Sequence, residues 1–380
     1  MSEWRPDILG DGFDCLDLDL GVDDEGPLVA TLVRALPAPR GIWRRWLGRA
    51  RALEDVDVLY VHGWSDYFFQ RSLARFFTDR GARFFALDLR KYGRSLRPGQ
   101  TPGYIEDLAD YDPEIALALA AMGHPIAVSR VQSALAGDAD EGADEAVDGG
   151  GAHPDPGSGR AADPAAPARG LVLLGHSTGG LILSLWCDRH RGVADALVLN
   201  SPWLELQLSG SIRRALAPMV SLRAKLNPYE LAAPQLDLGF YAQAQQQLAD
   251  PADPMTINPE WRPERTMPIR TGWLRAVLAG HARVSSGIDV GVPACVLLST
   301  RSQFGLSWND EMLRSDTVLD VDQVARAALR LGPTVTVERI DGALHDVFLS
   351  AAPVRAEAYR RLDRWLRGWR AADAPATRGV

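Results

Sequence analysis

Residues 171–180 read LVLLGHSTGG, an apolar run that ends abruptly in a serine flanked by glycines. The run predicts a buried strand, and the apolar residues 181–186 after it predict a buried helix. A tight turn between a strand and a helix needs glycine where backbones approach closely, which explains Gly175 and Gly179. Such a turn exposes a hydroxyl to a base and to a substrate, so the pattern predicts Ser177 as a nucleophile.

The composition describes a globular chain with one large core. Of the 380 residues, 46% are hydrophobic and 24% are charged. Charged residues interrupt the first 14 positions, where a signal peptide needs an apolar segment, and no apolar run approaches the roughly 20 residues that span a bilayer. We therefore expect a cytoplasmic protein. The net charge of −8 disfavours nucleic acid as a partner, and the three cysteines lie in apolar patterns typical of buried thiols.

Strand and helix patterns alternate along most of the chain. Residues 13–20 and 28–36 form two strand patterns separated by a turn, which predicts an N-terminal hairpin. Further strand patterns lie at 56–61, 84–89, 171–174, 196–199, 294–300 and 334–340, and helical patterns lie at 68–80, 113–121, 321–331 and 353–370. The alternation predicts an α/β fold with a mostly parallel sheet of about eight strands and helices on both faces.

Three segments do not fit this alternation. Residues 134–170 are almost devoid of large apolar side chains and predict a disordered surface insertion. Residues 42–53 carry tryptophans and arginines at helical spacing; we expect a short helix on the body, with weak membrane-surface contact as the alternative. Residues 203–291 are far longer than a crossover and predict a helical cap between two core parts, 1–202 and 292–380.

Among seven histidines, position favours His345 as the base for Ser177. It follows the last predicted strand, and loops at the carboxyl ends of parallel strands assemble the sites of such folds. A catalytic imidazole needs a carboxylate that fixes its tautomer. Asp316 leaves room for one helix and one strand before His345, so we favour it over Asp310, which lies in an earlier loop.

The order of Ser177, Asp316 and His345 along the chain is that of α/β-hydrolases. Within that superfamily the sequence resembles the monoglyceride lipase, lysophospholipase and serine aminopeptidase-like group. The resemblance rests on VLYVHGWSDY, ALDLRKYGRS, the serine turn, SDTVLD and GALHDV, and it covers nearly the whole chain. One departure is the long gap between Thr300 and Asp316, because the family usually places its acid directly after the strand.

The resemblance implies roles for the loop that begins at His62. The backbone N–H groups of Trp64 and Thr178 are expected to bind the developing oxyanion, and His62 to orient the loop. Tyr67 and Phe68 are either core residues or acyl contacts, and Trp203 is a further candidate for substrate binding.

Other family positions are implied to be structural. Asp88, Arg90 and Arg94 lie in the ALDLRKYGRS segment and are expected to brace the loops around the site.

The implied activity is hydrolysis of carboxylic esters with an apolar acyl group, without a cofactor or metal. Monoacylglycerols, lysophospholipids and short synthetic esters are the implied substrates. An aminopeptidase is the nearest alternative, although no acidic cluster that would hold an amino group stands out in the cap. A dehalogenase or epoxide hydrolase is disfavoured because those relatives carry aspartate where this chain has Ser177. A catalytically silent binding protein is the alternative from another class.

Overall fold

The computed structural model describes residues 3–39, 51–124, 169–206, 210–232, 237–251 and 253–373. Most of the predicted insertion, up to residue 168, and most of the arginine-rich segment, up to residue 50, lie outside the described residues. Within these ranges, none of the helices combines the length and the apolar character that crossing a membrane requires.

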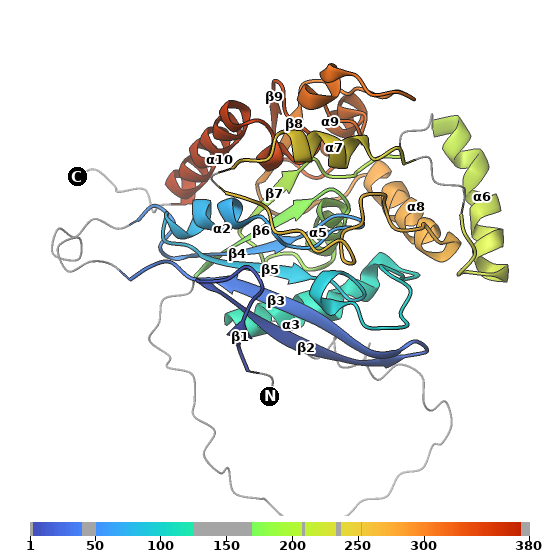
Figure 1. Cartoon of the computed structure of the whole chain (residues 1–380), viewed down its shortest axis with the longest axis horizontal. Coiled ribbons are helices and arrows are strands. Elements are labelled where there is room, and N and C mark those ends of the chain that lie inside the picture. Colours follow the sequence, from blue (N-terminus) through green and yellow to red (C-terminus); the bar gives the residue numbers. More distant parts are fainter. Residues whose placement is uncertain are drawn as a thin grey trace, which may run out of the picture.

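A single sheet forms the centre of the described part of the chain (Figure 1). Its nine described strands have the order β1-β2-β3-β5-β4-β6-β7-β8-β9. β2 and β3 form the predicted antiparallel hairpin, β3 pairs antiparallel with β5, and all pairs from β5 to β9 are parallel. The strands are β1 (Arg5–Pro6), β2 (Phe13–Asp23), β3 (Gly26–Ala35), β4 (Val56–Val61), β5 (Arg83–Asp88), β6 (Gly170–His176), β7 (Ala196–Asn200), β8 (Ala294–Ser299) and β9 (Val335–Ile340).

The predicted α/β architecture is confirmed, with one strand more than expected. β1 is only two residues long, and two residues are too few to show an alternating pattern in sequence. Gly170, at the end of the predicted insertion, is instead the first residue of β6. The three cysteines are buried and unpaired, as their apolar surroundings predicted.

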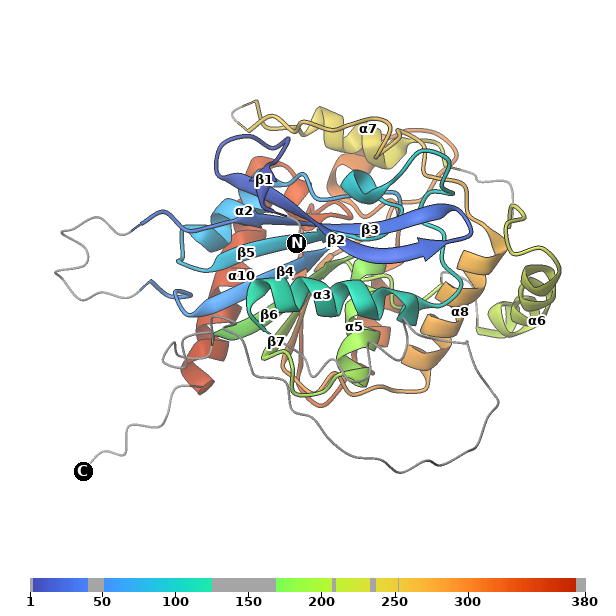
Figure 2. The ribbon, with the colours of Figure 1, turned by 90° about the horizontal axis from the view of Figure 1, so that it is seen from below.

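Helices cover both faces of the sheet (Figure 2). α2 (Arg71–Thr78) and α10 (Ala352–Asp373) pack into one apolar cluster, whereas α3 (Asp112–Met122), α5 (Thr178–Arg189) and α9 (Val321–Ala328) pack into the other. Strands buried on both faces are apolar at nearly every position, and β4, β6, β7 and β8 follow that rule.

Between β7 and β8 the chain forms α6 (Gly210–Leu226), α7 (Phe240–Gln247) and α8 (Thr271–Ser285). α6 packs on α8, α8 packs on α5, and α7 packs on the short helix η4 (Asp310–Arg314). These elements lie beside the end of the sheet to which the arrowheads of β6 and β7 point (Figure 1). The boundaries of a cap at 203 and 291 stay a prediction.

Buried charges hold the loop that follows β5. Asp88 accepts hydrogen bonds from the N–H of Phe68 at 2.9 Å and from Nη1 of Arg94 at 2.8 Å. Arg94 also binds both carboxylate oxygens of Asp7, at 2.6 and 2.8 Å. Arg90 forms a separate pair with Glu114 at 2.5 Å. Because these charges are paired inside the protein, they are suited to bracing the loop.

Candidate active site

Ser177 lies on the turn between β6 and α5 in a strained conformation. Its φ is +51° and its ψ is −118°, a region that non-glycine residues rarely adopt. A β-carbon on Gly175 would lie 2.6 Å from the carbonyl oxygen of Gly179, and one on Gly179 would collide with the carbonyl oxygen of His62. The turn therefore has the close backbone packing that the glycine spacing predicted.

Main-chain hydrogen bonds fix this turn. The N–H of Ser177 donates to the carbonyl oxygen of Asn200 at 3.0 Å, and the carbonyl oxygen of Ser177 accepts from the N–H groups of Gly180 at 3.0 Å and Trp203 at 2.9 Å. Ser177 lines a cavity of about 430 Å³. Its hydroxyl makes no hydrogen bond to another described residue, so it can meet a ligand in the cavity.

His345 and Asp316 form a buried pair beside that cavity. Nδ1 of His345 donates to Oδ2 of Asp316 at 2.9 Å, which leaves Nε2 as the acceptor. The other carboxylate oxygen accepts from the N–H groups of Val318 at 2.7 Å and Leu319 at 2.8 Å. Asp316 is fully buried and His345 is 3% exposed. The carboxylate is thus held by three donors, one of them the imidazole.

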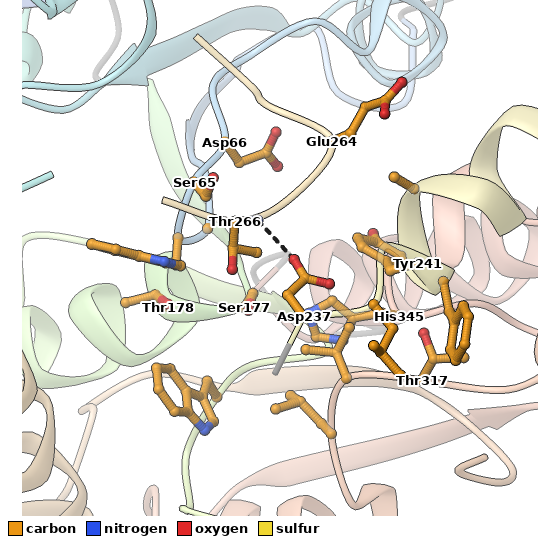
Figure 3. A pocket seen from close by; sticks show the side chains of 18 of the residues that line it. Ser65, Asp66, Ser177, Thr178, Asp237, Tyr241, Glu264, Thr266, Thr317 and His345 are labelled. Atoms are coloured by element: carbon orange, nitrogen blue, oxygen red, sulfur yellow. Dashed lines mark hydrogen bonds between the residues drawn. The ribbon is translucent and has the colours of Figure 1, made fainter. Parts of the chain in front are cut away.

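The side chains of Ser177 and His345 line the same cavity (Figure 3). Among the described residues, no hydrogen bond joins them. Contacts between a nucleophile and its base are often long before substrate binds and tighten in the complex. The absence of this bond therefore leaves Ser177 and His345 as candidates for nucleophile and base.

The gap between β8 and Asp316 is a loop that leaves the sheet and returns. The N–H of Asp316 donates to the carbonyl oxygen of Arg301 at 3.0 Å, and the carbonyl oxygen of Asp316 accepts from the N–H of Gln303 at 2.8 Å. Ser302 and Asp316 thereby form a parallel bridge. Asp316 lies next to the end of β8 despite its distance in sequence. Asp310 is exposed on η4 and does not line the cavity.

The loop after β4 lies against the serine. A β-carbon on Gly63 would be 2.9 Å from that of Ser177, and both Trp64 and Thr178 line the cavity. Neither the N–H of Trp64 nor that of Thr178 donates to another described residue. His62 holds this loop, because Nδ1 donates to the carbonyl oxygen of Gly63 at 2.8 Å and Nε2 accepts from the N–H of Leu89 at 3.1 Å. Burial lowers the pKa of His62, which favours the neutral ring that this bonding requires.

An ion pair that the sequence did not reveal ties the same loop to the segment after α7. Asp66 binds Nε of Arg262 at 2.8 Å, and Nη2 of Arg262 donates to Oε1 of Gln245 at 2.7 Å. Burial raises the pKa of Asp66. The hydroxyl of Ser65 accepts from the N–H of Met267 at 3.0 Å. The only signal in sequence was the position of Asp66 within the loop motif VLYVHGWSDY.

The cavity walls are mostly apolar. Trp203, a predicted substrate-binding residue, lines the cavity together with Leu206, Leu238, Phe240, Ile269, Phe304, Met312 and Leu319. Tyr67 and Phe68 do not line it, so the structure places them in the core instead. Phe68 packs against Tyr60 and Phe84, and the hydroxyl of Tyr67 accepts from the N–H of Asn258 at 2.9 Å.

Two carboxylates from residues 203–291, where no acidic cluster was expected, also line the cavity. Asp237 accepts a hydrogen bond from the N–H of Gly239 at 2.8 Å. It also accepts one from the N–H of Thr266 at 2.7 Å (Figure 3). Glu264 is exposed at the same cavity. These two carboxylates were not identified from the sequence, because the sequence does not predict how residues 203–291 fold. Elsewhere in the described ranges, no group of three or more His, Cys, Asp or Glu side chains is arranged to hold a metal.

Comparisons with known proteins agree with the observed fold. A family model described as serine aminopeptidase, S33, matches residues 160–287. The structure is similar to a soluble variant of monoglyceride lipase from Saccharomyces cerevisiae in complex with a substrate analogue, with 15% identity, a TM-score of 0.54 and 97% of each chain covered. A sequence comparison with curated proteins finds no match.

Two further solved structures have the same fold. A monoacylglycerol lipase from Paleococcus ferrophilus is 16% identical with a TM-score of 0.51, covering 89% of this chain and 99% of its own. A highly thermostable carboxyl esterase from Bacillus coagulans in complex with glycerol is 13% identical with a TM-score of 0.53, covering 95% and 100%. At such identities the likeness establishes the fold.

Proposed function

Because the chain has the α/β-hydrolase fold and resembles the monoglyceride lipase group, we propose that it is a serine hydrolase of carboxylic esters. The observation that carries the proposal is the buried pair between His345 and Asp316 at 2.9 Å, beside a cavity that Ser177 also lines. This is the set of groups that activates a hydroxyl for acyl transfer.

In the proposed reaction, Oγ of Ser177 attacks the ester carbonyl while Nε2 of His345 takes its proton. Asp316 stabilises the imidazolium, and the N–H groups of Trp64 and Thr178 bind the negative oxygen. Collapse of the intermediate breaks the bond to the alcohol, which receives the proton from His345. Water, deprotonated by His345, then cleaves the acyl-enzyme and regenerates Ser177.

The cavity supports an apolar acyl group joined to an alcohol without negative charge. Its apolar walls suit an acyl chain, whereas Asp237 and Glu264 would repel an anionic head group. Arg262 also lines the cavity, but its charge is paired with Asp66. We therefore favour monoacylglycerols over lysophospholipids that carry a net negative charge.

The test is a series of p-nitrophenyl esters from acetate to palmitate. We expect kcat/KM to rise with chain length to a maximum and to vanish in Ser177→Ala. A flat profile would contradict the preference for apolar acyl groups, because each buried methylene should contribute about 0.8 kcal/mol.

An aminopeptidase is the second candidate, and Asp237 and Glu264 are the observation that favours it. Two carboxylates in a cavity can hold a substrate ammonium group. Release of p-nitroaniline from amino-acid p-nitroanilides, lost in Ser177→Ala and weakened in Asp237→Asn, would support this candidate. If esters alone are cleaved, it is excluded.

We also propose that residues 203–291 act as a cap over the cavity. A cytoplasmic location and weak membrane contact by residues 42–53 stay predictions. Co-sedimentation with liposomes tests that contact, and a chain that stays in the supernatant would contradict it.

A further inference from the structure

A buried polar cluster joins the turn that carries Ser177 to the loop after β9 that carries His345, which we call the histidine loop. We define it as Asn200, Asp346 and Gln70, all of which are at most 4% exposed. None of them lines the cavity, and the proposed reaction uses none of them.

Asn200 is the last residue of β7, and it contacts both sides of the site. Its carbonyl oxygen accepts hydrogen bonds from the N–H of Ser177 and from Nδ1 of His176, both at 3.0 Å. Its side-chain Nδ2 donates to Oδ1 of Asp346 at 2.7 Å, and its Oδ1 accepts from the N–H of Val347 at 3.2 Å. One residue therefore binds the backbone of the nucleophile and the loop that carries the base.

Asp346 directly follows His345 and is held from three directions. Besides Asn200, its carboxylate accepts from Nε2 of Gln70 at 2.9 Å and from the N–H of Phe348 at 2.9 Å. Its own N–H donates to the hydroxyl of Tyr241 at 3.1 Å. These partners belong to the start of α2, to the histidine loop and to α7.

Burying these polar groups costs free energy, and their hydrogen bonds are satisfied in only one arrangement of the chain. A buried carboxylate without a cationic partner is stable only when its oxygens accept hydrogen bonds, and losing one partner leaves an unsatisfied group. The cluster therefore permits one position of the histidine loop relative to β7. Because β7 also fixes the backbone of Ser177, the distance between the nucleophile and the base is set by this cluster.

We propose that Asn200 and Asp346 are a pair of positioning residues that hold His345 within proton-transfer distance of Ser177. This inference rests on the proposed function. They act through the backbone of the two reacting residues and touch no substrate.

Asn200→Ala and Asp346→Asn test the proposal in the full chain. We expect kcat for a p-nitrophenyl ester to fall by roughly 10- to 100-fold in each variant, because a displacement near 1 Å can cost about that much. KM should change less than about threefold, since the cavity walls are untouched. The double variant should lose no more than about the worse single variant, because the two side chains act as one unit.

Val198→Ala is the matched control, because Val198 is a fully buried residue of the same strand without a polar side chain. It should lower the melting temperature but leave kcat within about twofold of wild type. If Asn200→Ala does not fold, the isosteric Asp346→Asn carries the same comparison. Equal kcat in wild type and Asp346→Asn, or an equal loss in Val198→Ala, would overturn the proposal.

Labelling with a fluorophosphonate separates this inference from the function on which it rests. Wild-type protein that is not labelled at Ser177 would refute the proposed function. Wild-type labelling with an unchanged labelling rate in Asn200→Ala and Asp346→Asn would refute the positioning role alone.

Discussion

The carboxylate of Asp316 shows how one residue can be fixed for a single task. The N–H groups of Val318 and Leu319 occupy one oxygen, which leaves the other for Nδ1 of His345. This fixed orientation determines which imidazole nitrogen carries the proton, and thereby directs the basic nitrogen away from Asp316.

Asp316→Asn should lower kcat by about 10⁴-fold, because an amide in that place favours the wrong histidine tautomer. Asp310→Asn is the matched control, since Asp310 is exposed on η4 and should be replaceable without effect. Both variants should keep the wild-type melting temperature within a few degrees. The assignment fails if Asp310→Asn proves to be the inactive variant.

The sequence allows a prediction where a residue's chemistry and its position in the chain point to the same role. Ser177 lies in a glycine-bounded turn and His345 follows a strand, and the structure brings both to one cavity. Tyr67 and Phe68 were not predictable in the same way, because an aromatic residue in a loop has the same pattern whether it faces a core or a cavity. Asp66 and Arg262 were missed because 196 residues separate them, and a lone charge in sequence suggests a solvated one.

At the scale of elements, the segment after α7 is tied to the loop after β4. The pair of Asp66 with Arg262 joins them, and the bond from Met267 to the hydroxyl of Ser65 lies beside it. The loop that these bonds hold also carries Trp64, the proposed oxyanion donor. Destabilising the segment after α7 should therefore also displace the loop that carries Trp64.

Arg262→Met should destabilise the protein by about 3–5 kcal/mol in the free energy of unfolding, because Asp66 would remain buried without its cationic partner. Urea unfolding measures this change. Adding Asp66→Asn should recover part of the loss. Arg275→Met, which breaks the more exposed pair with Glu106, should change stability far less. Equal losses in the two methionine variants would contradict the coupling.

The loop 303–315 accounts for the long gap in sequence between Thr300 and Asp316. Main-chain hydrogen bonds of Asp316 with Arg301 and Gln303 close the loop at its base. The loop therefore extends away from the sheet, and Asp316 stays next to the end of β8. The sequence gives the length of such a loop but not the hydrogen bonds that close it. Those bonds form between main-chain atoms, which every residue type supplies.

For the whole molecule, the mostly parallel sheet followed from the alternating strand and helix patterns, since parallel neighbours require helical crossovers. The packing of α6, α7 and α8 did not follow, because amphipathic spacing defines a buried face but not its partner. That Asp237 and Glu264 both line one cavity was therefore not predictable from the sequence.

Stability should depend on pH through His62 and His176. Burial lowers the pKa of both, whereas an unfolded histidine titrates near about 6.5. Between the lowered values and about pH 6.5 the unfolded chain binds more protons, so the free energy of unfolding should fall as the pH falls through this window. Urea unfolding between about pH 5 and 7 measures the slope, and His62→Gln should make it shallower. A wild-type slope equal to that of His62→Gln would contradict the role of His62.

We propose that Ser177 is reactive because His345 activates it. Wild type, Ser177→Ala and His345→Ala should be treated with a fluorophosphonate probe, and the modified residue identified by mass spectrometry of peptides. We expect modification of Ser177 in wild type and little or none in either variant. Modification of a different serine, or undiminished modification of Ser177 in His345→Ala, would contradict it.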